Sequence, residues 1–241
     1  MNKTIYFSHG DKGGVGKSML SAIIVDILLT RREMIAILEG DANQPDIVKR
    51  FAETGIGIGA INLNRAGDAE SAIMKFGEWI EKSDASNIVV NLPAGAGDTI
   101  DKLAPVLAEV LNMLNYYSIG FYSMGPTNSS TSSLNKSLEA GLLAFVDKKV
   151  VVYPEFLGDP NRFDAKKYEI PVDQEISIPS IRPDPLRDLV LSLDGPFSLL
   201  TDSSDLTLVE RAMLRRWVDQ VHDRVLRVFP YEDHSVSESG E

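Results

Sequence analysis

The chain has 241 residues, of which 44% are apolar and 24% are charged, and this composition suits one α/β domain with a sizeable core. Its formal net charge of −11 gives no general attraction to DNA or anionic lipid, although a local basic patch could still supply one. The absence of cysteine excludes disulfides, thiol catalysis, Cys-ligated zinc and iron–sulfur clusters, and it fits a cytoplasmic location.

Short apolar runs alternate with helical patterns along the chain, and this alternation predicts βαβ units. The uninterrupted apolar run at 88–90 is typical of a strand buried on both faces of a parallel sheet. We therefore expect an α/β fold in which a single doubly wound, mostly parallel sheet is flanked by helices. Strands are predicted at 4–8, 34–38, 58–63 at the sheet edge, 87–92, 116–124, 149–153 and 175–178. Helices are predicted at 18–29, 46–53, 69–82, 99–114, a stretch ending near 145, 184–193 and 205–228.

The C-terminal part of the chain combines the longest predicted helix with an acidic, serine-rich end at 230–241, which we expect to be disordered. Apolar residues three to four positions apart predict that one face of the helix packs on the core. That predicted face consists of Leu206, Val209, Met213, Trp217, Val221 and Val225. The charges of the helix are not one-sidedly basic, and the chain has neither a signal peptide nor an apolar run of about 18 residues, so we expect no membrane binding.

Four arginines of this helix allow two interpretations: Arg215, Arg216, Arg224 and Arg227. They could form a face that binds DNA phosphates without sequence preference. They could equally form an ordinary solvated face on an acidic protein, and the sequence leaves both interpretations open.

A glycine-rich segment lies between the first predicted strand and the first predicted helix. Residues 10–18 read Gly-Asp-Lys-Gly-Gly-Val-Gly-Lys-Ser, in the strand–loop–helix context that a P-loop requires. Glycines let the backbone N–H groups point at phosphates, and the helix N-terminus adds partial positive charge. Lys17 is predicted to reach the β- and γ-phosphates, and the Ser18 hydroxyl to bind Mg²⁺. A chance glycine-rich turn is the alternative, which this context disfavours.

We therefore predict that residues 1–229 form a nucleotide-binding domain that takes ATP or ADP together with Mg²⁺. The residues predicted to contact the nucleotide in this loop are Asp11, Lys12, Gly13, Gly14, Val15, Gly16, Lys17, Ser18 and Met19.

The segment 12–18 resembles the deviant Walker A motif of the ParA/MinD family of ATPases, which is marked by a second lysine ahead of the glycines. The chain departs from the usual P-loop spacing, because Asp11 stands where that pattern has a glycine. The resemblance implies a homodimer that forms around ATP, with Lys12 reaching the nucleotide of the partner and Lys17 acting on its own. Otherwise Lys12 is a surface lysine beside the phosphates.

Two further segments extend the resemblance. Residues 39–45 are similar to the switch I sequence Asp-x-Asp-Pro-Gln of the family, which implies that Asp41 orients the attacking water, with Glu39 replacing the first aspartate. Asp41 could instead be the N-cap of the next helix. Residues 89–95 resemble Walker B and switch II, but Asn91 replaces the aspartate that lies near Mg²⁺. The amide lacks the negative charge, so we expect weaker metal binding and slow hydrolysis, with Glu39 as a candidate source of the missing charge.

On the metal side, Ser18, Asp41 and Asn91 are therefore the candidate residues. On the base side, the resemblance places Pro179 against the adenine, and Tyr153 stands where the family often has an asparagine. Guanine recognition by Asn/Thr-Lys-x-Asp is not expected, since residues 135–138 lack the aspartate and fall inside a predicted helix.

The leading hypothesis is a ParA-like ATPase that serves DNA or plasmid partitioning, positioning, or transfer of cargo through an unknown adaptor or cargo protein. One rival is an ATP-dependent ligase of the dethiobiotin or cobyrinate synthase type, which Lys12 disfavours. The other is a nucleotide-dependent interaction protein with little hydrolysis, which Asn91 favours. His9 is expected to pack beside the loop rather than act as a base.

Overall fold

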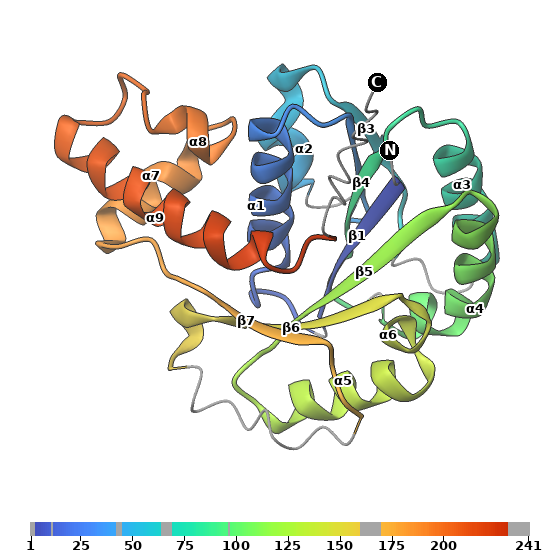
Figure 1. Ribbon diagram of the computed structural model, residues 1–241. Helices are drawn as coiled ribbons and strands as arrows, with labels where there is room; N and C mark the ends of the chain where they lie inside the picture. Colours follow the sequence, from blue (N-terminus) through green and yellow to red (C-terminus); the bar gives the residue numbers. More distant parts are fainter. Residues whose placement is uncertain are drawn as a thin grey trace, which may run out of the picture.

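The computed structural model describes residues 3–10, 12–41, 45–63, 69–95, 97–159 and 170–230. Within these residues, a seven-stranded sheet has the order β3-β2-β4-β1-β5-β6-β7, and all its neighbouring strands are parallel (Figure 1). The strands are β1 (Lys3–His9), β2 (Ile35–Glu39), β3 (Gly57–Ala60), β4 (Asn87–Asn91), β5 (Tyr116–Ser123), β6 (Lys148–Pro154) and β7 (Gln174–Ile178). The helices are α1 (Lys17–Thr30), α2 (Asp46–Phe51), α3 (Ala69–Glu81), α4 (Gly97–Met113), α5 (Asn128–Ala140), α6 (Leu142–Phe145), α7 (Asp184–Ser192), α8 (Phe197–Leu200) and α9 (Leu208–Leu226), with 3₁₀ turns η1 (Ala52–Thr54) and η2 (Glu155–Leu157).

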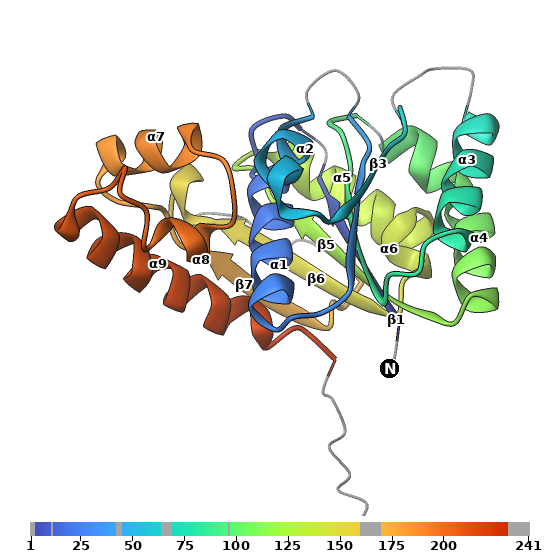
Figure 2. The ribbon, with the colours of Figure 1, turned by 90° about the horizontal axis from the view of Figure 1, so that it is seen from above.

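Helices cover both faces of the sheet, as predicted for a doubly wound fold (Figure 2). Helices α1, α2, α7, α8 and α9 lie on one face, and α3 to α6 lie on the other. Alternate residues of each strand enter the two cores: Tyr6 and Val89 face α1, whereas Phe7 and Val90 face the opposite helices. All four side chains are buried, which explains the uninterrupted apolar runs in the sequence.

The parallel sheet brings the carboxyl ends of β1, β2 and β4 to one edge. The register places Asn91 beside both Ser8 and Glu39. The connection that follows each of these strands carries one of the three motifs found in the sequence, so the topology assembles those motifs into one place.

The helix predicted to end near residue 145 is broken into α5 and α6 at Gly141. The carboxylate of Asp101 occupies the space beside this glycine and accepts a hydrogen bond from the Leu142 N–H (2.8 Å). The prediction of one continuous helix was therefore wrong at this turn, because the Asp101 side chain from α4 inserts where the helix would continue.

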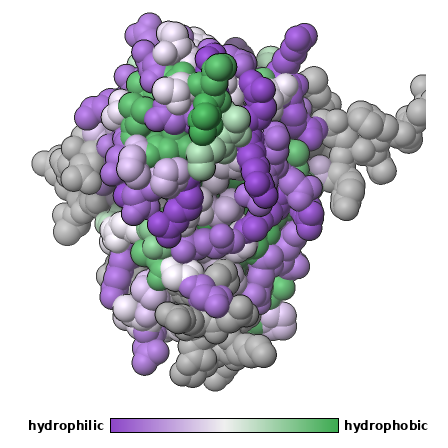
Figure 3. Space-filling view, turned by 90° about the vertical axis from the view of Figure 1, so that its left-hand side faces the viewer, coloured by the Kyte–Doolittle hydropathy of each residue, from purple (hydrophilic) through white to green (hydrophobic). Residues whose placement is uncertain are grey.

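The long C-terminal helix begins at Leu208 rather than at 205, since Thr207 and Glu210 form a capping box. Its predicted buried face was wrong at two positions: Val209 and Met213 are 68% and 42% exposed. Leu214 and Val218 are buried instead, together with the predicted Trp217, Val221 and Val225. Leu208, Val209 and Met213 at the start of α9 are exposed, and apolar side chains gather on one part of this side of the molecule (Figure 3).

Smaller differences concern element ends. The edge strand ends at Ala60, and α8 has no counterpart among the predicted helices. The predicted tail falls outside the described residues except for Pro230. None of the helices that the structure describes combines the length and the apolar composition of a membrane-spanning segment.

Candidate functional site

The P-loop turns tightly between β1 and α1. Gly14 and Gly16 have positive φ angles of 77° and 87°, a backbone conformation that residues with a Cβ rarely adopt. Gly16 is the N-cap of α1. Val15 between them is buried, so its side chain faces the protein. A contact from Val15 to a ligand would therefore come from its backbone. Asp11 lies outside the described residues.

The two lysines of the loop have different surroundings. Lys17 is buried, and its ammonium donates to the Lys12 carbonyl across the loop (2.8 Å). Ser8 in β1 donates to the Lys17 carbonyl (2.9 Å), which ties the start of α1 to the sheet. Lys12 is exposed, and its ammonium lies 3.4 Å from the Thr127 hydroxyl at the start of α5. Lys12 does not line the cavity that Lys17 lines.

A cavity of about 250 Å³ lies between the three motifs. Lys17, Ser18, Asp41 and Asn91 all line it, so the fold brings these predicted site residues together. The remaining wall is formed by Gly13, Gly14, Gly16, Asp46, Leu92, Pro93 and Ala94. Backbone amides, one ammonium and several oxygen donors in a cavity of this kind suit a chain of phosphates with a hard cation.

Glu39 is fully buried behind this cavity and is tied to Asn91. The Asn91 amide nitrogen donates to both carboxylate oxygens of Glu39 (3.0 and 3.1 Å), and the Asp41 N–H donates to one of them (2.9 Å). Burial raises the pKa of Glu39 to about 7, against the lowering effect of these hydrogen bonds. The network continues from Asn91 to the hydroxyls of Ser18 (3.4 Å) and Ser21 (3.2 Å).

The donor set fits Mg²⁺ bound with a nucleotide. Ser18 and Asp41 offer oxygen atoms, which this ion prefers. The predicted Asn91 instead turns its amide nitrogen toward Ser18 and Glu39 and its oxygen toward Ser21. Among the described residues, no group of three or more His, Cys, Asp or Glu side chains could hold a metal by itself. A cation at this place would therefore depend on phosphate oxygens and water for most of its ligands, as Mg²⁺ does in nucleotide sites.

A second cavity of about 660 Å³ adjoins the first, since Ser18 and Asp46 line both. Met19 and Pro179, two predicted nucleotide contacts, lie on its wall. Phe156 also lines it, and was missed by the sequence interpretation. The volume lies in the range of pockets that hold small organic ligands, and the wall is mostly apolar, as a base requires.

Phe156 lies directly beside the P-loop. A Cβ placed on Gly16 would lie 3.2 Å from its ring. The 3₁₀ turn that carries Phe156 is held by Glu155, which pairs with Arg224 of α9 and accepts a hydrogen bond from Ser177 of β7. An aromatic residue just after a strand end is the signal that could have identified it. Tyr153 points the other way, into the core beneath α3 to α6.

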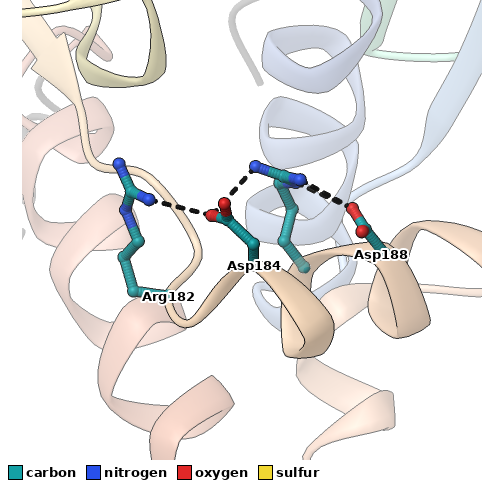
Figure 4. Close-up of polar contacts among 4 residues, drawn as sticks. Arg182, Asp184 and Asp188 are labelled. Atoms are coloured by element: carbon teal, nitrogen blue, oxygen red, sulfur yellow. Dashed lines mark hydrogen bonds and ion pairs between the residues drawn. The ribbon is translucent and has the colours of Figure 1, made fainter.

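The far wall of the larger cavity belongs to the C-terminal helices. Arg187 of α7 lines this wall and pairs with Asp184 and Asp188, and Asp184 also pairs with Arg182 (Figure 4). Opposite them, α2 reaches the same helices through one arginine: Arg50 lies over the Phe197 ring (3.9 Å) and donates to the Leu193 carbonyl (3.2 Å). Helix α2, which follows the Asp41 segment, is thus joined directly to the C-terminal helices.

His9 closes β1 but lines neither cavity. It is buried, its ring lies edge-on to Tyr122 (5.1 Å), and burial together with the charge of Lys17 lowers its pKa to about 4. It therefore packs beside the loop, as expected. Asn135 lies inside α5, so the residues nearest to a guanine motif are far from a strand end, as the sequence indicated.

Three of the four C-terminal arginines considered for DNA binding are engaged with carboxylates. Arg215 pairs with Asp202, Arg227 pairs with Asp223 of the same helix, and Arg224 pairs with Glu155. These pairs reduce the positive charge that the helix offers to a phosphate backbone, and DNA binding stays a prediction.

Comparison with known proteins agrees with this architecture. No protein-family model matches the chain. Protein MobD of Acidithiobacillus ferrooxidans is 27% identical over 224 residues, which cover 90% of this chain and 94% of MobD. Among solved structures, the MinC:MinD cell division protein complex of Aquifex aeolicus matches with a TM-score of 0.56 and 13% identity, over 95% of this chain and 98% of that one.

The septum site-determining protein MinD of Pyrococcus horikoshii, complexed with Mg-ADP, matches with a TM-score of 0.54 and 15% identity, over 94% of this chain and 98% of that one. Identities this low establish the fold and nothing finer. The chain has the P-loop NTPase fold of MinD-type ATPases, with a seven-stranded parallel sheet flanked by helices.

Proposed function

We propose that this chain binds ATP with Mg²⁺, dimerises around it, and acts as a ParA-like ATPase switch. The observation that carries the proposal is the division of labour between two lysines of one loop. Lys17 is buried at the phosphate cavity, whereas Lys12 is exposed beside it and points toward α5. An exposed lysine in this position is available to a nucleotide held by a second copy.

The two adjoining cavities divide the nucleotide between them. The N–H groups of residues 13–18 and the Lys17 ammonium would hold the phosphates. Met19, Phe156 and Pro179 would enclose the base. A bound Mg²⁺ would neutralise part of the phosphate charge. Ser18 would be its protein ligand. That MinD of Pyrococcus horikoshii was solved with Mg-ADP on the same fold supports this assignment.

Asp41 and Asn91 determine the expected rate of hydrolysis. Asp41 lies on the cavity wall, where its carboxylate could orient an attacking water. Asn91 brings an amide where related ATPases have a carboxylate, so we expect turnover to be slow. A protein that binds ATP and scarcely hydrolyses it is the second candidate function, and Asn91 is the observation that favours it.

The cellular role we propose is partitioning, positioning or transfer of DNA, a plasmid or another cargo, through an adaptor or cargo protein that recognises the ATP-bound dimer. One match supports a partner-dependent role in general: MinD of Aquifex aeolicus was solved in complex with MinC. Loss of the γ-phosphate would free the Asp41 segment, and α2 would carry that change to the C-terminal helices through Arg50.

Calorimetric titration with ATP, ADP and GTP in the presence of Mg²⁺ tests the binding site. We expect ATP and ADP to bind and GTP to bind much more weakly. The K17A variant should lose about 10- to 100-fold in affinity, because a charge-assisted bond to phosphate is removed. The F156A variant should lose about tenfold for ATP and ADP alike through lost stacking, and nothing for inorganic triphosphate. Absence of nucleotide binding by the wild type would refute the proposal.

A further inference from the structure

We propose that Glu39 supplies the negative charge of the magnesium site, and that Asn91 is a positioning residue that holds the Glu39 carboxylate in place. The inference rests on the proposed function, because it concerns the cation that accompanies the nucleotide. It assigns to the end of β2 a charge that the resemblance had placed at the end of β4.

The strand register and three hydrogen bonds fix the position of the Glu39 carboxylate. The β2–β4 register puts Glu39 directly beside Asn91. One amide nitrogen of Asn91 lies within 3.0 and 3.1 Å of the two carboxylate oxygens, so both oxygens are held by one group. The Asp41 N–H supplies a further bond at 2.9 Å. A long side chain held at both oxygens is fixed in one orientation.

The amide of Asn91 fits its surroundings at the end of β4. Asn91 uses both ends of its side chain: the nitrogen donates to Glu39, and the oxygen accepts from the Ser21 hydroxyl (3.2 Å). An aspartate at this position could not donate to Glu39 and would instead place a second carboxylate against it, at a cost from like charges. A glutamate at position 39 therefore favours an amide, rather than a carboxylate, at position 91.

The Glu39 carboxylate has no positively charged side chain paired with it among the described residues. Glu39 is fully buried. A buried carboxylate is costly unless a cation offsets it. Asn91 also reaches the Ser18 hydroxyl (3.4 Å), so Glu39 lies one amide group away from the predicted metal ligand. A divalent cation at Ser18 is positioned to offset this charge.

Glu39 does not line the phosphate cavity, whereas Asn91 does. Glu39 thus acts through Asn91 and through its electrostatic field, as outer groups of metal sites do, rather than as a direct ligand. This position accounts for a metal site that keeps its charge although the residue at the cavity wall is neutral.

The test measures how strongly Mg²⁺ strengthens the binding of a fluorescent ADP analogue, which involves no hydrolysis. The ratio of affinities in Mg²⁺ and in EDTA is determined for the wild type, E39Q, and the exchanged variant E39Q/N91D. An exposed glutamate, changed in E53Q, controls for net charge. In E39Q we expect the ratio of the affinity in Mg²⁺ to the affinity in EDTA to fall by about 10-fold or more, while the affinity in EDTA is unchanged. The exchanged variant should regain the ratio, and E53Q should match the wild type.

A wild-type ratio in E39Q would overturn the inference, and so would an exchanged variant no better than E39Q. If E39Q does not fold, the exchanged variant still decides, because it again pairs one amide with one carboxylate: a wild-type ratio supports the exchange, and a lost ratio contradicts it. A wild type that binds no ADP under either condition would refute the proposed function itself, which separates the two failures.

Discussion

At the scale of single residues, His9 has a pKa that is changed by its burial beside the P-loop. Its pKa is lowered to about 4 from 6.5, chiefly by burial and further by Lys17. Between these values the unfolded chain binds a proton that the folded chain does not. The stability contributed by neutral His9 is therefore complete above pH 6.5 and is lost as the pH falls toward 4.

We predict that this loss appears as a difference between the wild type and H9Q, measured without nucleotide. Urea unfolding at pH 7.5 and pH 5 should show the wild type losing about 2 kcal/mol more than H9Q, from 1.36 kcal/mol per pH unit over the window below 6.5. H9Q is the control for the wild type, since the two proteins share every other titrating group. Equal losses in the two proteins would show that His9 is protonated in the folded state.

The sequence predicted the lining of the smaller cavity better than that of the larger one. Lys17 and Ser18 begin the helix after β1, Asp41 follows β2, and Asn91 ends β4; parallel strands bring such positions together. Phe156 could not be found in this way, because its place depends on the 3₁₀ turn that Arg224 holds from a distant helix. The Glu39 bond to Asn91 likewise depends on the register of two strands, which no local pattern specifies.

At the scale of elements, the break between α5 and α6 depends on Gly141, which has no side chain and so leaves room for the Asp101 carboxylate. A Cβ on Gly141 would lie 2.3 Å from the Asp101 carboxylate, which also binds Leu142 N–H. We predict that G141A lowers the free energy of unfolding by about 1–3 kcal/mol, because overpacking displaces this carboxylate.

The matched control is G77A in the middle of α3, where the added methyl meets its nearest neighbour at an ordinary 3.9 Å. There alanine should be neutral or stabilising by up to about 1 kcal/mol, since glycine weakens a helix. Denaturant unfolding of both variants makes the comparison. A G141A protein as stable as G77A would mean that Asp101 moves aside without cost.

The existence of most elements could be predicted from apolar runs and helical spacing, but the phase of α9 could not. Its sequence offers two overlapping apolar stripes, and the choice between Met213 and Leu214 is made by where α8 and β7 lie. The residue at which α9 begins is likewise determined by its N-cap, Thr207, and not by the apolar stripe.

At the scale of the whole molecule, the proposed site joins two halves of the structure. The P-loop and the Asp41 segment line the smaller cavity, which we propose holds the phosphates, and the C-terminal helices form the far wall of the larger one, which we propose holds the base. Arg50 connects the two through α2. In the switch that we propose, a change at the γ-phosphate would pass through Arg50 to the surface carried by α7, α8 and α9.

The most direct test of the central claim is the mass of the protein in solution, measured by light scattering with Mg²⁺ and ADP, ATP or a non-hydrolysable ATP analogue. We predict that the wild type doubles its mass with ATP or the analogue and not with ADP. The K12A variant should bind ATP and remain a monomer, whereas K75A, which removes an exposed lysine of α3, should behave like the wild type. A mass that ignores the nucleotide, or a K12A protein that dimerises as the wild type does, would contradict the account.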